Sequence, residues 1–380
     1  MKRSVALVLL AFAAAGVQAV QDCELDGQHV NPSNGSTTAG KTGLMRCRDR
    51  DSGVLQREQE LQDGKFMGLV RYYEQGKLRK EHSVNARSNM HGRAREFGPQ
   101  GQVLSDSVYD NGRETGIARR FHPNGQLRRA GFHGEGGSEQ AAAEFNERGQ
   151  LSQLRCGGQT LLAPAVDDAR LCGFAGASQV EMFDARGALY ARASYLAGQR
   201  ARIEQLHANG KTQLLREDSP TRQFEQEFAP DGIKRRETER TLDGKTLVAV
   251  KSLQYSEAGT LVRDQRWADG KPVSDTSFYL NGQPRSKTVH GNSQAGDWVE
   301  ETQYRDDGSV AATGRYLGTP GGRRQPTGTH KTFNAAGRVV AESDYDARGR
   351  LSRERTWNDA GAPLRDDAVF EDGSRKAFAK

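Results

Sequence analysis

The sequence predicts an all-β fold: an extended antiparallel array of β-hairpin repeats that forms a long twisted sheet, in two lobes around a disulfide-bearing insertion. Three observations predict it. An aromatic residue stands four positions before a glycine at intervals along most of the 380 residues. Apolar residues alternate with other residues after these glycines, as on a strand with one apolar face. Apolar residues make up only 35% of a chain that holds 44 glycines, so any core must be thin.

The aromatic-to-glycine motif recurs with a period that is typical of repeat proteins. It pairs Tyr72 with Gly76, Phe97 with Gly101, Phe121 with Gly125, Phe145 with Gly149, Phe183 with Gly187, Phe228 with Gly232, Tyr255 with Gly259, Phe278 with Gly282, Tyr304 with Gly308, Phe333 with Gly337, Tyr345 with Gly349 and Trp357 with Gly361, while Leu206 takes the aromatic place before Gly210. The glycines from 76 to 149 follow one another at steps of 25, 24 and 24 residues.

Each repeat is interpreted as a β-hairpin. Pro, Asn, Asp and Glu fill the turn, and the glycine stands where a positive φ is needed. Beyond the turn, Val103 and Tyr109 have the same parity and therefore face the same side of a strand. A second, tighter turn is expected half a period later, in the segments "YDNG", "YLAG" and "WADG" that end at Gly112, Gly198 and Gly270.

Residues 1–19 have the pattern of a secretory signal peptide. Lys2 and Arg3 precede the apolar run "SVALVLLAFAAAGV", and a cleavage site is expected after Ala19. No later segment has the length of about 20 apolar residues that a membrane-spanning helix needs. We therefore expect an exported, periplasmic protein without stable membrane insertion.

Four cysteines fall into two pairs that are close in sequence. In an oxidising compartment the simplest connectivity joins Cys23 to Cys47 and Cys156 to Cys172. The alternative is a four-sulfur metal site, but neither pair has the tight spacing of zinc ligands. We expect two disulfides and no metal.

The repeats divide the chain further. Residues 20–60 are expected to form an N-terminal cap with the first disulfide, 61–153 a first repeat block, 154–180 an insertion with the second disulfide, and 181–380 a second repeat block. The period is also irregular at residues 236–250 and 316–330.

Residues 35–42 match the phosphate-loop pattern of nucleotide-binding enzymes, with Gly35, Gly40, Lys41 and Thr42 at the required positions. That loop works only between a buried strand and a helix. The preceding "DGQHVNPSN" is polar, and the following segment reaches Gly53 without a long apolar stripe. The match is interpreted as a surface turn, and no cofactor is expected.

No catalytic constellation emerges from the other motifs. The chain has no nucleophile elbow and no zinc-binding helix. His122 and His207 lie within turns, where a histidine is interpreted as a solvated polar residue rather than a base. Asp167 and Asp168 could pair with Arg170, but a solvated loop is the favoured interpretation. The protein is not expected to be an enzyme.

The charge balance does not favour a nucleic-acid partner. The chain carries 55 basic and 49 acidic residues, a net charge of +6, which becomes +4 without Lys2 and Arg3. The bases are interspersed with acids rather than gathered in a block. We expect the charge to keep a repeat array soluble.

The aromatic, turn, glycine and aliphatic pattern, with its shorter Tyr-x-x-Gly turn between, resembles the variant MORN repeat of the bacterial YwqK-like antitoxin family across residues 60–375. The resemblance implies an exported immunity protein that binds and sterically blocks an envelope-acting toxin, type VI secretion phospholipases among them. The alternative is a structural envelope module that binds peptidoglycan, lipid or an assembly partner. Segments 154–180 and 316–330 are expected to hold distinctive contacts, although no individual partner-binding residue can be assigned.

Overall fold

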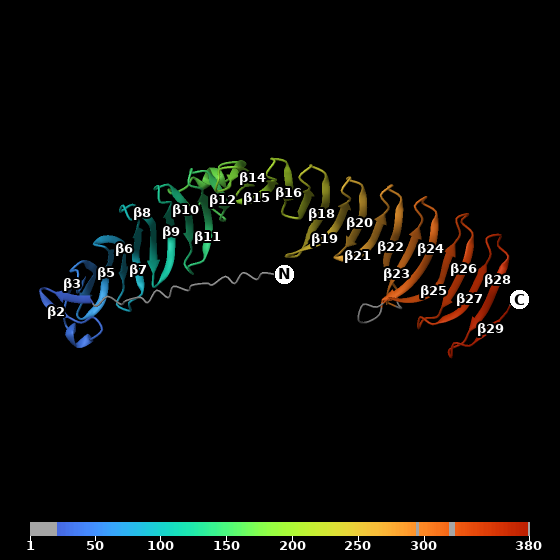
Figure 1. Ribbon diagram of the computed structural model, residues 1–380, viewed down its shortest axis with the longest axis horizontal. Coiled ribbons are helices and arrows are strands. Elements are labelled where there is room, and N and C mark those ends of the chain that lie inside the picture. Colours follow the sequence, from blue (N-terminus) through green and yellow to red (C-terminus); the bar gives the residue numbers. More distant parts are fainter. Residues whose placement is uncertain (1–20, 294–295, 319–323, 379–380) are drawn as a thin grey trace, which may run out of the picture. The chain divides into compact units, whose positions relative to one another are not determined.

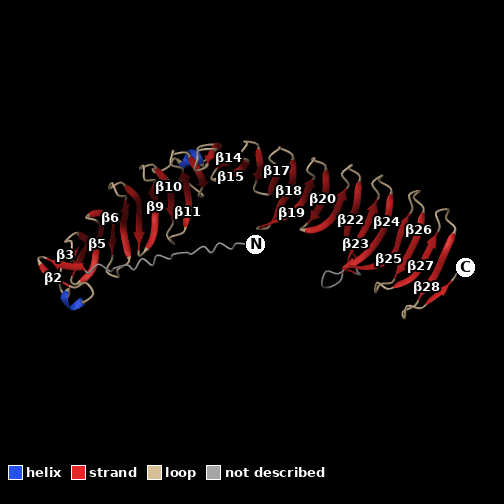
Figure 2. Cartoon of the chain, viewed as in Figure 1, coloured by secondary structure: helices blue, strands red, loops and turns tan. Residues whose placement is uncertain are grey.

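Short turns organise the chain into two antiparallel sheets in which almost every strand pairs with its neighbours in sequence (Figure 1). The computed structural model describes residues 21–293, 296–318 and 324–378; the expected signal peptide lies outside them. The chain forms two compact units, unit 1 with residues 21–175 and 183–188, and unit 2 with residues 176–182 and 189–378. Among the described residues helix is confined to two short segments (Figure 2), so the all-β prediction is confirmed.

The first sheet has 12 strands in the order β12 to β3, then β1 and β2. Its strands are β1 (Gln21–Leu25), β2 (Gln28–Val30), β3 (Gly43–Asp49), β4 (Leu55–Gln62), β5 (Lys65–Glu74), β6 (Lys77–Val84), β7 (Met90–Phe97), β8 (Val103–Asp110), β9 (Arg113–Phe121), β10 (Leu127–His133), β11 (Glu139–Phe145) and β12 (Leu151–Arg155). The 3-10 helix η1 (Gly35–Thr37) follows β2, and the helix α1 (Asp168–Leu171) follows β12.

The second sheet has 17 strands in sequence order. They are β13 (Ser178–Phe183), β14 (Leu189–Leu196), β15 (Gln199–Leu206), β16 (Thr212–Asp218), β17 (Arg222–Phe228), β18 (Lys234–Asp243), β19 (Thr246–Tyr255), β20 (Leu261–Ala268), β21 (Lys271–Phe278), β22 (Pro284–Ser293), β23 (Gly296–Tyr304), β24 (Val310–Gly318), β25 (Arg324–Phe333), β26 (Val339–Tyr345), β27 (Leu351–Trp357), β28 (Pro363–Val369) and β29 (Arg375–Ala377).

The recurring motif forms a wide turn with a glycine bulge. Between β9 and β10, Gly125 N–H donates to the His122 carbonyl (2.9 Å) and His122 N–H donates to the Gln126 carbonyl (2.8 Å). Gly125 has a φ of 85°, as expected for the left-handed residue that closes such a turn. The bulge brings Phe121 directly opposite Leu127. The motif therefore spaces an aromatic and an aliphatic residue so that they become a cross-strand pair.

The tight turns are two-residue hairpins. Asn111 and Gly112 have φ values of 49° and 85°, the left-handed pair that a type I′ turn requires. The same geometry occurs at Ala197 with Gly198, as the sequence predicts. Gln75 and Gly76 also form such a turn, with φ values of 52° and 75°, so grouping this motif with the wide turns was wrong.

Two turn histidines link neighbouring wide turns. His122 Nε2 donates to the Phe145 carbonyl (2.8 Å), and His207 Nε2 donates to the Phe228 carbonyl (2.9 Å). Both acceptors belong to the aromatic residue that opens the next wide turn. The interpretation of these histidines as solvated polar residues was therefore wrong, because each is half-buried and satisfies a carbonyl of its neighbour.

Asparagines just before the turn glycine make a second set of links between wide turns. In each case the side-chain amide donates to the carbonyl at the third position of the next motif: Asn124 to Glu147 (2.9 Å), Asn209 to Pro230 (2.7 Å) and Asn281 to Asp306 (2.6 Å). Successive wide turns are thus hydrogen-bonded to one another along the ends of the strands.

Four strands carry a bulge whose signal was missed in the sequence. In each, three residues lie against one residue of the preceding strand, and a glycine with positive φ is one of the three: Gly68 against Glu60, Gly92 against Ser83, Gly116 against Ser107 and Gly328 against Gly314. Gly92, Gly116 and Gly328 stand five residues before the aromatic of a motif and Gly68 stands four residues before Tyr72, a spacing that could have revealed the bulges.

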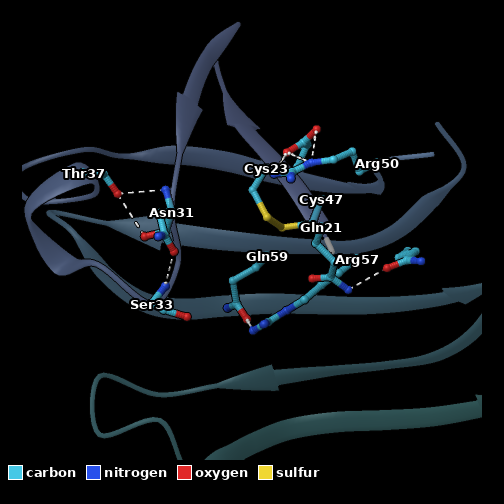
Figure 3. Close-up of a disulfide and its surroundings, with 11 residues drawn as sticks. Gln21, Cys23, Asn31, Ser33, Thr37, Cys47, Arg50, Arg57 and Gln59 are labelled. Atoms are coloured by element: carbon cyan, nitrogen blue, oxygen red, sulfur yellow. Dashed lines mark hydrogen bonds and ion pairs between the residues drawn. A yellow bond between two sulfur atoms is a disulfide. The ribbon is translucent and has the colours of Figure 1, made fainter. Parts of the chain in front are cut away.

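One apolar core lies at the start of the described chain. Cys23, Leu25, Met45 and other buried side chains form one cluster, and Phe66 packs against it. The disulfide between Cys23 and Cys47 joins residues that face each other on β1 and β3 (Figure 3). After Leu206, the only buried apolar side chain among the described residues belongs to Val299. The rest of the second sheet is therefore held by half-buried pairs, consistent with the thin core that the composition predicts.

The insertion at 154–180 has a packed interior. The predicted disulfide joins Cys156 to Cys172, and Leu162 is fully buried. Asp168 is 1% exposed, and its Oδ2 accepts the backbone N–H groups of Leu161 (2.6 Å) and Leu162 (2.8 Å). The expected solvated loop was thus wrong, because this carboxylate is an internal clamp. Asp167 instead caps α1 by accepting Arg170 N–H (3.1 Å).

Ala197→Asn should stabilise unit 2. Ala197 holds a φ of 48°, which is unfavourable for alanine and well tolerated by asparagine, and Asn-Gly is the preferred type I′ pair. We expect the free energy of unfolding to rise by about 0.5–1 kcal/mol, measured by urea denaturation. Ala208→Asn, in a turn where alanine does not have positive φ, is the matched control. Equal effects of the two substitutions would contradict the assignment.

Asp168→Ala should destabilise unit 1 by about 3 kcal/mol, because it leaves two buried backbone N–H groups without their acceptor. Asp167→Ala removes only a helix cap and should cost about 1 kcal/mol. Thermal unfolding monitored by circular dichroism compares the two variants. A smaller effect for Asp168→Ala than for Asp167→Ala would show that the carboxylate is not a clamp.

Candidate functional site

Opposite charges face each other in a continuous row across the first sheet. From β3 to β9, the directly paired residues are Arg46, Glu58, Arg71, Glu81, Arg95, Asp106 and Arg119. Arg71 bridges Glu58 and Glu81 at 3.4 Å each, and Arg95 also contacts Glu81. Each opposite-charge pair across strands contributes a few tenths of a kcal/mol or more. The sequence does not reveal this row, because the strand register decides which charges meet.

Glu58 is the most heavily coordinated carboxylate of this row. Burial raises its pKa, but hydrogen bonds from the Tyr73 hydroxyl (2.8 Å) and from Arg46 and Arg71 outweigh burial and hold the pKa below its usual range. The ionised form is therefore the one that the sheet stabilises.

The second sheet uses the same device. Glu237 is buried, and it accepts hydrogen bonds from Lys234 (2.7 Å) and Gln226 (3.1 Å) and pairs with Lys251 (2.6 Å). Burial raises the pKa of Glu237, but these partners lower it by more, so that the resulting pKa is about 2. Near the C-terminus, Arg353 binds Asp366 through two hydrogen bonds of 2.8 Å each.

This pairing decides what the sheet faces can bind. Charges that are already paired with one another are less available to a charged partner such as a nucleic-acid backbone. Paired side chains are also fixed in one arrangement, so the faces are ordered before any partner arrives. Such a surface suits recognition of another molecule by its shape and by those side chains that do not belong to a charge pair.

The phosphate-loop pattern does not have the architecture that nucleotide binding needs. After Lys41 and Thr42 the chain enters the strand β3, so no helix N-terminus points at the loop. Lys41 Nζ donates to Gln28 Oε1 (3.2 Å), and Thr42 Oγ1 accepts the N–H of Asp63 (2.9 Å). The loop packs within the cap, as the interpretation of a surface turn expects.

His133 lines a hollow of about 240 Å³ on the first sheet and belongs to a chain of polar groups. Ser107 Oγ donates to Glu114 Oε1 (2.5 Å), and His133 Nε2 lies 3.2 Å from Glu114 Oε2. The carboxylate thus stands between serine and histidine, so the histidine cannot take the serine proton as it does in a hydrolase triad. The described residues also contain no cluster of three or more potential metal ligands. None of the helices that the structure describes is long and apolar enough to cross a membrane.

The irregular segment at 236–250 is a long hairpin. Strands β18 and β19 have 10 residues each. At its tip, Leu242 and Leu247 face each other across the strands and remain 44% and 43% exposed. An exposed apolar pair at a hairpin tip differs from the paired charges of the sheet faces.

The irregular segment at 316–330 lies on β24 and β25, apart from 319–323, which are outside the described residues. Here His330 packs between two tyrosines, with ring centroids 4.9 Å from Tyr316 and 4.8 Å from Tyr345. His330 Nε2 donates to the Arg315 carbonyl (2.8 Å), which fixes the ring. Arg315 on β24 covers Trp298 on β23, with its guanidinium carbon 4.6 Å from the ring centroid. The sequence singles out this segment as irregular but not the aromatic cluster, which depends on the bulge at Gly328.

Residues 114–133 match the family model described as MORN repeat variant. The match covers strands β9 and β10 and includes the bulge residue Gly116 and the turn residue Gly125. It supports the MORN-type repeat that the sequence resembles. No curated protein matches this chain in sequence.

Among solved structures, the chain is similar to the crystal structure of TcdB2-TccC3-TEV, with 13% identity and a TM-score of 0.18 over 89% of this chain. It is also similar to the Photorhabdus luminescens Tc holotoxin pore, with 14% identity and a TM-score of 0.16 over 89% of this chain. This chain spans 19% and 23% of those chains, respectively.

Glu237→Gln should flatten the loss of stability in acid. The folded pKa of about 2 lies below the ordinary value of 4.5, so ionised Glu237 stabilises the fold above about pH 4.5. This contribution disappears as the pH falls from 4.5 towards 2. Between pH 5 and 2, we expect the wild-type chain to lose about 2 kcal/mol more than Glu237→Gln in urea denaturation. Glu257→Gln, at an exposed turn position, is the control and should follow the wild type; parallel curves for all three would contradict the role of Glu237.

Proposed function

We propose that this protein is a periplasmic immunity protein that binds a secreted, envelope-acting toxin and blocks its active site sterically. The observation that carries the proposal is the pair of open antiparallel sheets whose face charges are neutralised by their own neighbours. Such sheets offer large ordered surfaces at little conformational cost on binding.

A neutralising complex needs an interface of about 1,600 Å² or more, with a few apolar or aromatic anchors at its centre. The hairpin β18–β19 offers such anchors. Leu242 and Leu247 project at its tip and are exposed at the same position on both strands. Unlike the buried carboxylates of the sheet faces, these two apolar side chains remain accessible to a partner.

The insertion at 154–180, expected to hold partner contacts, now has a structural reason to interrupt the repeat. Its disulfide, the buried Leu162 and the Asp168 clamp are features of a compact linking segment. We therefore assign the contact to unit 2 rather than to this insertion.

Export is part of the proposal. Both cysteine pairs are oxidised, which fits maturation in an oxidising compartment. The signal-peptide pattern of residues 1–19 directs the chain to the same place. The resemblance to YwqK-like antitoxins suggests a phospholipase among the toxins that act there.

A toxin whose gene neighbours that of this protein is the direct test. The purified chain, mixed with that toxin, should form a complex that survives gel filtration and should abolish lipase or other toxin activity at equimolar ratio. Leu242→Glu with Leu247→Glu should weaken the complex at least about tenfold, because two charges would be buried at its centre. Leu280→Glu is the matched control, since Leu280 is an exposed leucine at a wide turn. Full toxin activity in the presence of excess wild-type protein would refute the immunity function.

A further inference from the structure

The bulge on β25 differs from the other three bulges in the residue that it faces. Glu60, Ser83 and Ser107 lie opposite the earlier bulges, whereas Gly314 lies opposite residues 328–330. A side chain at position 314 would have its Cβ 2.7 Å from the Nδ1 atom of His330. The glycine therefore lets the imidazole ring lie against the strand and leaves a hollow of about 130 Å³ beside it.

The hollow is lined by small residues at its floor, by polar side chains on the neighbouring strands and by aromatic rings at one end. Ala312 and Gly314 form the floor, with Gln303 and Thr332 directly opposite Ala312 on the two neighbouring strands. Tyr316 and His330 form an aromatic wall at one end. Because the space is open and small, it suits one ring of an extended ligand rather than a whole compact ligand.

The polar groups of the hollow are both donors and acceptors. Gln303 Nε2 donates to Glu301 Oε1 (3.0 Å), which places an amide and a carboxylate side by side. Arg324 lies 3.6 Å from the other Glu301 oxygen and balances its charge. Burial, and to a smaller extent the Glu301 carboxylate, raises the pKa of Tyr316, so its hydroxyl remains a neutral donor. A ligand with adjacent hydroxyl groups and no net charge matches this set.

We propose that this hollow binds a single sugar unit of a neutral oligosaccharide. The C–H face of a pyranose ring packs on an aromatic side chain, while its vicinal hydroxyls pair with neighbouring planar amide and carboxylate groups. A protein partner is less suited, because protein anchors need pockets that remove them fully from water. An ionic ligand is less suited, because the two charged residues of the lining, Glu301 and Lys331, are already paired with Arg324 and Glu342. The sugar site is independent of toxin binding at the tip of β18–β19.

The test uses the full chain and three probes: the N-acetylglucosamine tetramer, cellotetraose and maltotetraose. At least one should give saturation-transfer signals and a Kd of about 0.1–5 mM by calorimetry, as expected for an open site with few hydrogen bonds. Tyr316→Ala should weaken binding at least about tenfold by removing part of the aromatic wall. Gly314→Ala should do the same without removing any ring, because the added Cβ displaces His330.

Tyr255→Ala is the control for loss of a tyrosine outside the hollow, since Tyr255 lies on β19 of the same unit and faces Leu261. It should leave the Kd unchanged, and circular dichroism checks that all variants fold. Absence of binding by all three probes at about 10 mM would overturn the proposal, as would equal binding by wild type, Tyr316→Ala and Gly314→Ala. Binding of a tyrosine-containing peptide in place of the sugars, with the same sensitivity to Gly314→Ala, would assign the hollow to a protein ligand and also overturn it.

Discussion

The fold depends on the direct cross-strand pairing of an aromatic residue with the aliphatic residue that follows the turn glycine. The glycine bulge creates this pairing, because it shifts the register by one residue just where the aromatic lies, as for Phe121 and Leu127. Within the described sheets a strand has no second layer to pack against, so it is stabilised by its neighbouring strands. The register of each hairpin must therefore be fixed by its own turn. A glycine with positive φ fixes the turn without steric strain.

The same lack of a second layer explains why charged residues are so prominent. Large apolar side chains at the half-buried positions of a single sheet would leave much apolar surface exposed to water. It can hold an arginine or a glutamate whose opposite charge stands on the next strand, as Arg71 does between Glu58 and Glu81. The pairs both hold the register and keep the faces soluble. As a consequence, charged side chains that form these pairs are less available to bind a partner.

Turn chemistry made most of the fold predictable from sequence. The positive φ of the motif glycines, the tight turn at Gly112 and both disulfides follow from local rules that need no tertiary information. The features that were missed all depend on register or on burial. The charged row from Arg46 to Arg119 exists only once strands are aligned, and the burial of Asp168 depends on how the insertion folds back on itself. The hollow beside His330 was beyond sequence reasoning for the same reason, because it needs Gly314 and the bulge of the next strand to coincide.

A repeat that pairs many of its charged side chains with those of neighbouring strands restricts where new functions can arise. Substitution of a paired arginine or a motif glycine costs stability, whereas a position at which the pairing is already interrupted can change at little cost. Two such positions stand out in unit 2: the lengthened tip that carries Leu242, and the bulge where Gly314 replaces a side chain. The tip lies in the irregular segment 236–250, and the bulge residues 328–330 that face Gly314 lie in the irregular segment 316–330. In an array of this kind, departures from the period that no packed core explains are therefore the places to look for binding.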